Sequence, residues 1–98
     1  MKHFLVNIDY LLPVEQLAEI LPLHRAFLQT GYEAGYLLCS GPKNPKTGGL
    51  VVARAESLET LQSFFANDPY LLNKVAEYTF VEFEPVKHQP FLADWVTG

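Results

Sequence analysis

The order of apolar patterns along the chain limits its fold more than any other feature of the sequence. A strand is expected over residues 4–10, because apolar residues there recur at every second position, which is the period of a half-buried strand. The apolar even positions are Phe4, Val6, Ile8 and Tyr10, and the polar residues Asn7 and Asp9 occupy odd positions. Through the rest of the chain, segments whose apolar residues recur with the helical period alternate with segments whose apolar residues recur at every second position.

Two helical segments are expected directly after this strand. A short helix should follow Pro13 and run to Leu21, because Pro22 would break an established helix. Pro22 suits the first turn of a new helix, and Gly31 and Gly35 indicate that this second helix ends near residue 34. Its expected apolar face consists of Leu23, Phe27, Leu28 and Ala34.

The second half of the chain supplies a hairpin, a helix and a last strand. Tyr36–Ser40 and Leu50–Arg54 are short apolar runs that should pair, since the intervening residues 41–49 are dense in turn formers. Ser57 is a good N-cap for a helix through Ala66, and residues 78–84 alternate loosely as a strand. The resulting order, β-α-β-β-α-β, predicts a ferredoxin-like α+β fold with both helices on one face of an antiparallel sheet.

The strands carry apolar residues on both faces, although the helices can cover only one face. Leu37 and Cys39 are expected on one face of their strand and Tyr36 and Leu38 on the other, and the second strand of the hairpin shows the same two-sided character. A second copy of the sheet is the simplest cover, so a homodimer through the sheet face is expected. Cys39 is interpreted as a buried, unreactive thiol.

Residues 1–98 are interpreted as one domain, with residues 87–98 as a C-terminal tail. The tail has no regular period but contains four apolar residues: Phe91, Leu92, Trp95 and Val96. Exposed together, these side chains would form an apolar patch of the kind that marks contacts. The tail is therefore expected to pack onto the fold or onto its partner.

Composition excludes several classes of partner. The formal net charge is -4 and no cluster of lysine and arginine is present, so nucleic acid is not an expected partner. The longest apolar runs are far shorter than a membrane span, and no membrane association is expected. The single cysteine cannot form an internal disulfide and no signal peptide is recognisable, so the cytoplasm is the expected compartment.

Two polar residues, His24 and Asp68, occupy positions where the helical patterns call for hydrocarbon. A buried polar group without a partner costs about 1 to 3 kcal/mol, so the two are expected to be each other's partner. Either residue also has a simpler interpretation. His24 could cap or pack its helix, and Asp68 could be the N-cap of a helix that begins at Pro69. The capping role leaves one carboxylate oxygen for His24.

A histidine beside a carboxylate is suited to proton transfer, because the carboxylate fixes the tautomer and the ordinary pKa of histidine lies near 6.5. Other candidates rank lower. Ser40 could donate a hydrogen bond to a substrate or be an ordinary turn serine, and Tyr70 could line the pocket or fill the core. Arg25 is expected to be a solvated charge. His3 and His88 lack the spacing of metal ligands, so neither a metal nor another cofactor is expected.

Three segments, in this order and with this spacing, resemble the YciI-like (YCII-related) domain family: Leu23–Leu28 around His24, the run Gly35–Pro42, and Asn67–Tyr70. The resemblance implies a dimeric α+β barrel, similar in fold to muconolactone isomerase. It also implies that His24 and Asp68 are the active-site pair. One characterised branch of the family eliminates chloride from chlorinated hydroxyquinols.

Two functional hypotheses follow for the chain. The first is a small cofactor-independent enzyme, a lyase or an isomerase, that acts on an aromatic or enolic small molecule by elimination or isomerisation. In this enzyme His24 would be the general base and Asp68 would orient it, with Ser40 and Tyr70 against the substrate. The alternative is a non-catalytic dimeric module that binds a small ligand or a partner protein in the same cleft.

Overall fold

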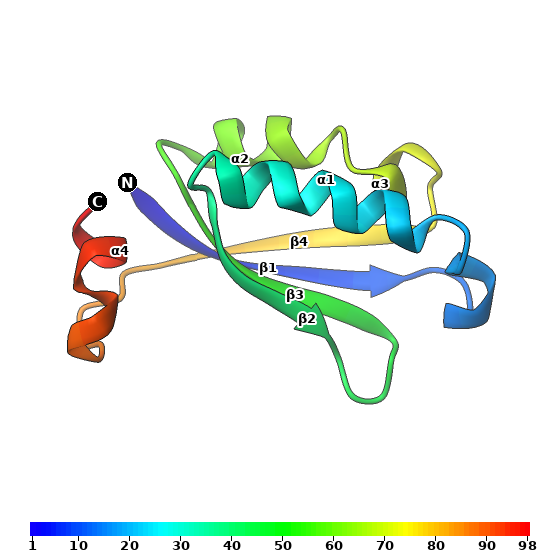
Figure 1. The fold of residues 1–98 in the computed structure, drawn as a ribbon, viewed down its shortest axis with the longest axis horizontal. Coiled ribbons are helices and arrows are strands. Elements are labelled where there is room, and N and C mark those ends of the chain that lie inside the picture. The colour runs from blue at the N-terminus through cyan, green and yellow to red at the C-terminus, as the bar shows by residue number, and fades with distance from the viewer.

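Four antiparallel strands form one sheet, with three helices packed on one of its faces (Figure 1). The structure is a computed structural model that describes residues 1–98. The strands are β1 (Lys2–Tyr10), β2 (Leu37–Pro42), β3 (Gly48–Ala55) and β4 (Ala76–Phe83), in the spatial order β2-β3-β1-β4. The helices on the sheet are α1 (Leu21–Glu33), α2 (Leu58–Phe65) and α3 (Pro69–Leu72). The predicted ferredoxin-like α+β fold is confirmed.

The segment before α1 differs from the prediction. Instead of an α-helix to Leu21, a short 3-10 helix, η1 (Val14–Leu17), ends early and α1 begins at Leu21 with Pro22 in its first turn. This start shifts the buried face of α1 to His24, Leu28 and Gly31. Leu23, which was expected on that face, is 58% exposed.

Glycine plays two different roles along α1. Gly31 does not end the helix but lies inside it, where an added Cβ would lie 2.7 Å from Phe64 Cζ and 2.8 Å from Leu37 Cδ1. Its lack of a side chain therefore allows α1 to approach α2 and β2 closely. Gly35 adopts a φ of +81° just after the C-cap Ala34, which is the left-handed conformation that commonly ends a helix.

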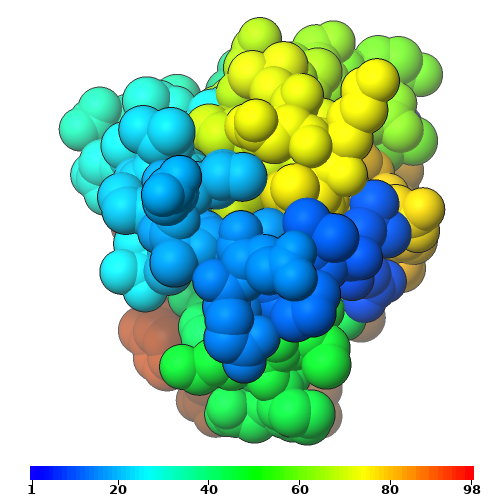
Figure 2. Space-filling model, turned by 90° about the vertical axis from the view of Figure 1, so that its right-hand side faces the viewer, coloured from blue at the N-terminus to red at the C-terminus, as the bar shows by residue number.

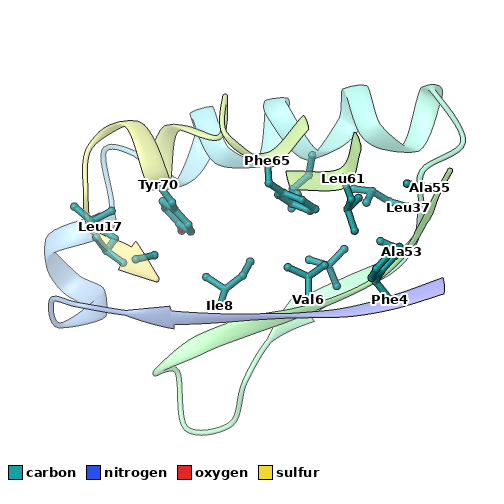
Figure 3. Close-up of a cluster of buried hydrophobic side chains, with 14 residues drawn as sticks. Phe4, Val6, Ile8, Leu17, Leu37, Ala53, Ala55, Leu61, Phe65 and Tyr70 are labelled. Atoms are coloured by element: carbon teal, nitrogen blue, oxygen red, sulfur yellow. The ribbon is translucent and has the colours of Figure 1, made fainter. Parts of the chain in front are cut away.

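The core fills the space between the helices and the sheet (Figure 3). Inward residues of β1 contribute Phe4, Val6 and Ile8, and α2 contributes Leu61 and Phe65. Ser57 caps α2 as predicted, because its side chain accepts a hydrogen bond from the backbone N–H of Thr60. This packing fixes α2 and the turn that follows it, and that turn carries Asp68.

A bulge in β2 corrects the prediction for Cys39. The register between β2 and β3 shifts between Leu37 and Cys39, so Leu37 points to the core while Cys39 pairs with Val52 on the outer face. Cys39 is therefore an exposed thiol and not a buried one. The same shift places Ser40 opposite Val51, on the face that carries the helices. A bulge of this kind redirects all side chains that follow it.

The tail forms a 3-10 turn, η2 (Pro90–Leu92), and a short helix, α4 (Ala93–Thr97). It packs on the outer face of the sheet. There Arg54 donates to the carbonyl oxygen of Trp95 at 2.9 Å and lies over its ring, and His3 contacts the carbonyl oxygen of Val96 at 3.2 Å. Phe91, in contrast, is 83% exposed. None of the helices is long and apolar enough to cross a membrane.

Candidate active site

His24 ends the first turn of α1, with its ring turned toward α3. Its backbone N–H donates to the carbonyl oxygen of Ile20 at 2.9 Å, so the start of the helix fixes the backbone of His24. The ring Nδ1–H donates to the carboxylate of Asp68, at 2.8 Å from Oδ1 and 3.0 Å from Oδ2. The structure therefore brings together the two residues that the sequence singled out, although 44 positions separate them.

Asp68 is completely buried and accepts hydrogen bonds from three different groups. As the N-cap of α3, it receives the backbone N–H of Tyr70 on Oδ1 at 3.0 Å. Its Oδ2 also receives the hydroxyl of Tyr78. Capping and pairing with His24 thus occur at the same time. A carboxylate held by three donors has no freedom to rotate away from the imidazole.

Two tyrosines complete the surroundings of the pair. The ring of Tyr70 stacks on that of His24, with centroids 3.9 Å apart and planes 9° from parallel. Burial raises the pKa of Tyr70, and contacts with Tyr10 raise it further. Burial also raises the pKa of Tyr78, together with the charge of Asp68. Both phenols therefore stay protonated at neutral pH, and Tyr78 acts as a hydrogen-bond donor to Asp68.

Sequence reasoning missed Tyr78. Its position carried a usable signal, because Ala76, Tyr78 and Phe80 are the alternate residues of β4 that face the helices. Tyr78 pairs with Ile8 of β1 and so lies beneath the turn that bears Asp68. What could not be read from the sequence is the separation between this strand position and Asp68, which depends on how α3 crosses the sheet.

A cavity of about 360 Å³ opens beside His24, bounded by η1, α1, β1 and the β2–β3 hairpin. Figure 2 views the end of the molecule where η1 (blue), the start of α1 (cyan) and the hairpin (green) meet. Every buried side-chain nitrogen and oxygen atom of the protein has a hydrogen-bond partner. His24 Nε2 has none, so this atom is not among the buried ones. Nε2 is therefore accessible, and His24 lines this cavity. Asp68 lies behind it, out of reach of a ligand.

Ser40 and Tyr70, the two expected substrate contacts, also line the cavity. The hydroxyl of Ser40 lies 2.7 Å from that of Tyr32, so these two groups share a hydrogen bond. Arg25 is exposed, as expected of a solvated charge, and it also belongs to the cavity wall, as does the exposed Lys46 of the hairpin loop. No group of three or more His, Cys, Asp or Glu side chains has a geometry that could hold a metal ion.

Comparison with known proteins agrees with this architecture. The structure is similar to that of 5-chloro-2-hydroxyhydroquinone dehydrochlorinase from Burkholderia phenoliruptrix AC1100, solved in complex with 2,5-dihydroxybenzoquinone. The TM-score is 0.68 at 19% identity, over 93% of this chain and 98% of that one, which shows a shared fold. No curated protein matches the sequence. The model of the YCII-related domain matches residues 1–84, and the chain therefore belongs to the YCII-related domain family.

Proposed function

We propose that the protein is a small enzyme that uses His24 as a general base on an aromatic or enolic small molecule, for elimination or isomerisation without a cofactor. One observation carries the proposal. Asp68 binds Nδ1–H of His24 from the buried side, and this leaves the lone pair of Nε2 directed to a cavity. A neutral imidazole with one nitrogen fixed and the other free has the arrangement that a general base needs.

The reaction starts when Nε2 takes a proton from a phenol or from a carbon next to a carbonyl. In an elimination, the electron pair released by that proton forms a new C=O or C=C bond, and the leaving group departs with its own bonding pair. In an isomerisation, His24 returns the proton to another atom of the same molecule. Asp68 stabilises the imidazolium that forms in either case, because the carboxylate lies 2.8 Å from Nδ1.

Several features of the cavity support a flat substrate of this kind. Its volume of about 360 Å³ lies at the lower end of the range for small-molecule sites. Tyr70 holds the imidazole plane by stacking, and Ser40 adds a hydroxyl to the cavity lining. The dehydrochlorinase that shares this fold was solved with a substituted benzoquinone, so chlorinated hydroxyquinols are a suitable first class of compounds to test.

A turnover screen with the purified protein tests the proposal. Chlorinated hydroxyquinols, including 5-chloro-2-hydroxyhydroquinone, would be assayed for chloride release, and enolisable ketones for deuterium uptake from D₂O by NMR. At least one class should react faster than in buffer, and His24→Asn should abolish the excess rate. Binding without any turnover would contradict the proposal and favour the alternative, a non-catalytic module that binds a ligand in the same cavity.

We also propose a homodimer formed through the outer face of the sheet. Large apolar side chains are exposed there, with Leu50 at 41%, Phe83 at 43% and Val81 at 52%. The helices occupy the other face and α4 covers only one end of this one (Figure 1). A second copy would bury these side chains, and obligate interfaces of this kind commonly exceed about 2,000 Å² in total.

Light scattering at micromolar concentration is expected to give twice the chain mass of 11.1 kDa. Val81→Lys places a charge on the outer face, on the edge strand β4, and should shift the protein to monomers. Leu72→Lys is the matched control, because Leu72 is 64% exposed on α3, away from that face. A monomeric wild-type protein, or equal behaviour of the two variants, would contradict the dimer.

We place the protein in the cytoplasm. Cys39 is its only cysteine and is an exposed free thiol, which fits a reducing compartment. Trapping of Cys39 in its free form from cell extracts, by rapid alkylation, would support this placement.

A further inference from the structure

The charges around the cavity are distributed very unevenly. The chain has 11 acidic and 7 basic side chains, excluding histidine, and a net charge of -4. Two of the basic side chains, Arg25 and Lys46, line the cavity, whereas no aspartate or glutamate does. An acidic protein thus presents a cavity whose only charged wall residues are cations, beside a histidine that becomes a third cation when it takes a proton.

Neither of these cations is neutralised within the chain. Lys43 pairs with Asp9 and His24 bonds to Asp68, and no other acidic side chain lies within ion-pairing distance of a basic one, so Arg25 and Lys46 have no acidic partner. Neither side chain donates a hydrogen bond to any other protein group. This contrasts with Arg54, which is held by carbonyl oxygens of Gly35 and Trp95. Arg25 and Lys46 therefore keep their full donor capacity for a ligand.

The two cations approach the cavity from different walls. Arg25 follows His24 on α1, and Lys46 belongs to the loop between β2 and β3. Arg25 is also close enough to Tyr70 for its charge to oppose the rise in the pKa of that phenol, a rise that is caused mainly by burial. Its positive charge therefore acts on Tyr70, the cavity-lining residue that stacks on His24.

We propose that the ligand of this cavity carries a carboxylate, which Arg25 and Lys46 bind, on the aromatic or enolic ring that His24 deprotonates. The reaction in this statement rests on the proposed function, whereas the preference for an anion rests on the charges alone. A guanidinium matches a carboxylate with two parallel hydrogen bonds, and a lysine ammonium adds a second charge.

A pair of probes with one ring and different charge tests the inference. 2,5-Dihydroxybenzoate is an anion at pH 7.5, and 2,5-dihydroxybenzamide is neutral and of nearly the same shape. Calorimetric titration of the wild-type protein should show that the benzoate binds at least about tenfold more tightly, as expected for charge-assisted hydrogen bonds. Added salt should weaken benzoate binding and leave amide binding unchanged.

Variants assign the preference to particular residues. Arg25→Gln and Lys46→Gln should each weaken benzoate binding severalfold, and the double variant should bind the two probes equally. Lys87→Gln is the matched control, because Lys87 is an exposed cation of the tail that does not line the cavity. It should bind both probes as the wild type does. A preference that survives in the double variant would overturn the assignment.

The outcomes separate this inference from the proposed function. Equal affinity for the two probes, or binding of neither, overturns the carboxylate-bearing ligand even if a neutral compound is turned over by His24. A charge preference that depends on Arg25 and Lys46, in a protein that turns over no candidate, upholds the anion site and removes the enzymatic proposal. Binding is measured without turnover, so the two results are independent.

Discussion

His24→Asn is expected to lower kcat/KM about 10²- to 10⁴-fold for the best substrate found, because general-base catalysis is lost. Asparagine can still donate to Asp68 from a position near that of Nδ1, but it has no basic nitrogen for the cavity. The loss should therefore fall on kcat more than on KM. Initial rates over a range of substrate concentrations measure both parameters.

The matched control for this variant is His88→Asn. His88 is exposed in the segment before η2 and bonds only to the carbonyl oxygen of the adjacent Gln89. Its replacement should leave the rate unchanged. If His24→Asn retained wild-type kcat while folding normally, His24 would be a packing residue and the proton would be taken by another group.

Asp68→Ala is expected to lower the free energy of unfolding by about 3 to 5 kcal/mol, because it removes a buried carboxylate that accepts hydrogen bonds from three donors. The change leaves three donors without an acceptor: His24 Nδ1–H, the Tyr78 hydroxyl and the backbone N–H of Tyr70. Such a loss is a large part of the total stability of a domain of this size. Urea unfolding followed by circular dichroism measures it.

Two further variants give stability changes with which that of Asp68→Ala can be compared. Tyr78→Phe removes only one of the three donors to Asp68 and should cost about 1.5 to 3 kcal/mol, the range for a hydrogen bond to a charged group. Asp9→Ala is the surface control, because Asp9 pairs with Lys43 in solvent and its loss should change stability little. If Asp68→Ala were no more destabilising than Asp9→Ala, the buried network would contribute nothing to the fold.

The order of helices and strands was predictable because it depends on the spacing of apolar residues within each segment. Phe4, Val6 and Ile8 predicted the inward face of β1, and Ser57 predicted the start of α2 from capping chemistry alone. The proximity of His24 and Asp68 was also predictable, because two polar residues on otherwise apolar helical faces need partners. These inferences required no knowledge of distances between elements.

Other features depend on small shifts that a sequence pattern does not encode. α1 begins at Leu21, and this start turns Leu23 outward and His24 inward. The bulge in β2 reverses the orientations expected after Leu37, which exposes Cys39 and turns Ser40 toward the cavity. Arg25 and Tyr78 belong to the site through the tertiary arrangement of α1 and β4, and neither residue breaks a local pattern.

The tautomer of His24 tests the central claim most directly, because Nε2 can act as a base only if the proton resides on Nδ1. Long-range ¹H–¹⁵N NMR of the wild-type protein, on the alkaline side of the His24 titration, should show a protonated Nδ1 and an unprotonated Nε2. In Asp68→Asn, the side-chain amide can donate to Nδ1, so the proton is expected to move to Nε2. A wild-type His24 that carries its proton on Nε2 would contradict the account, since its Nδ1 could then not donate to Asp68.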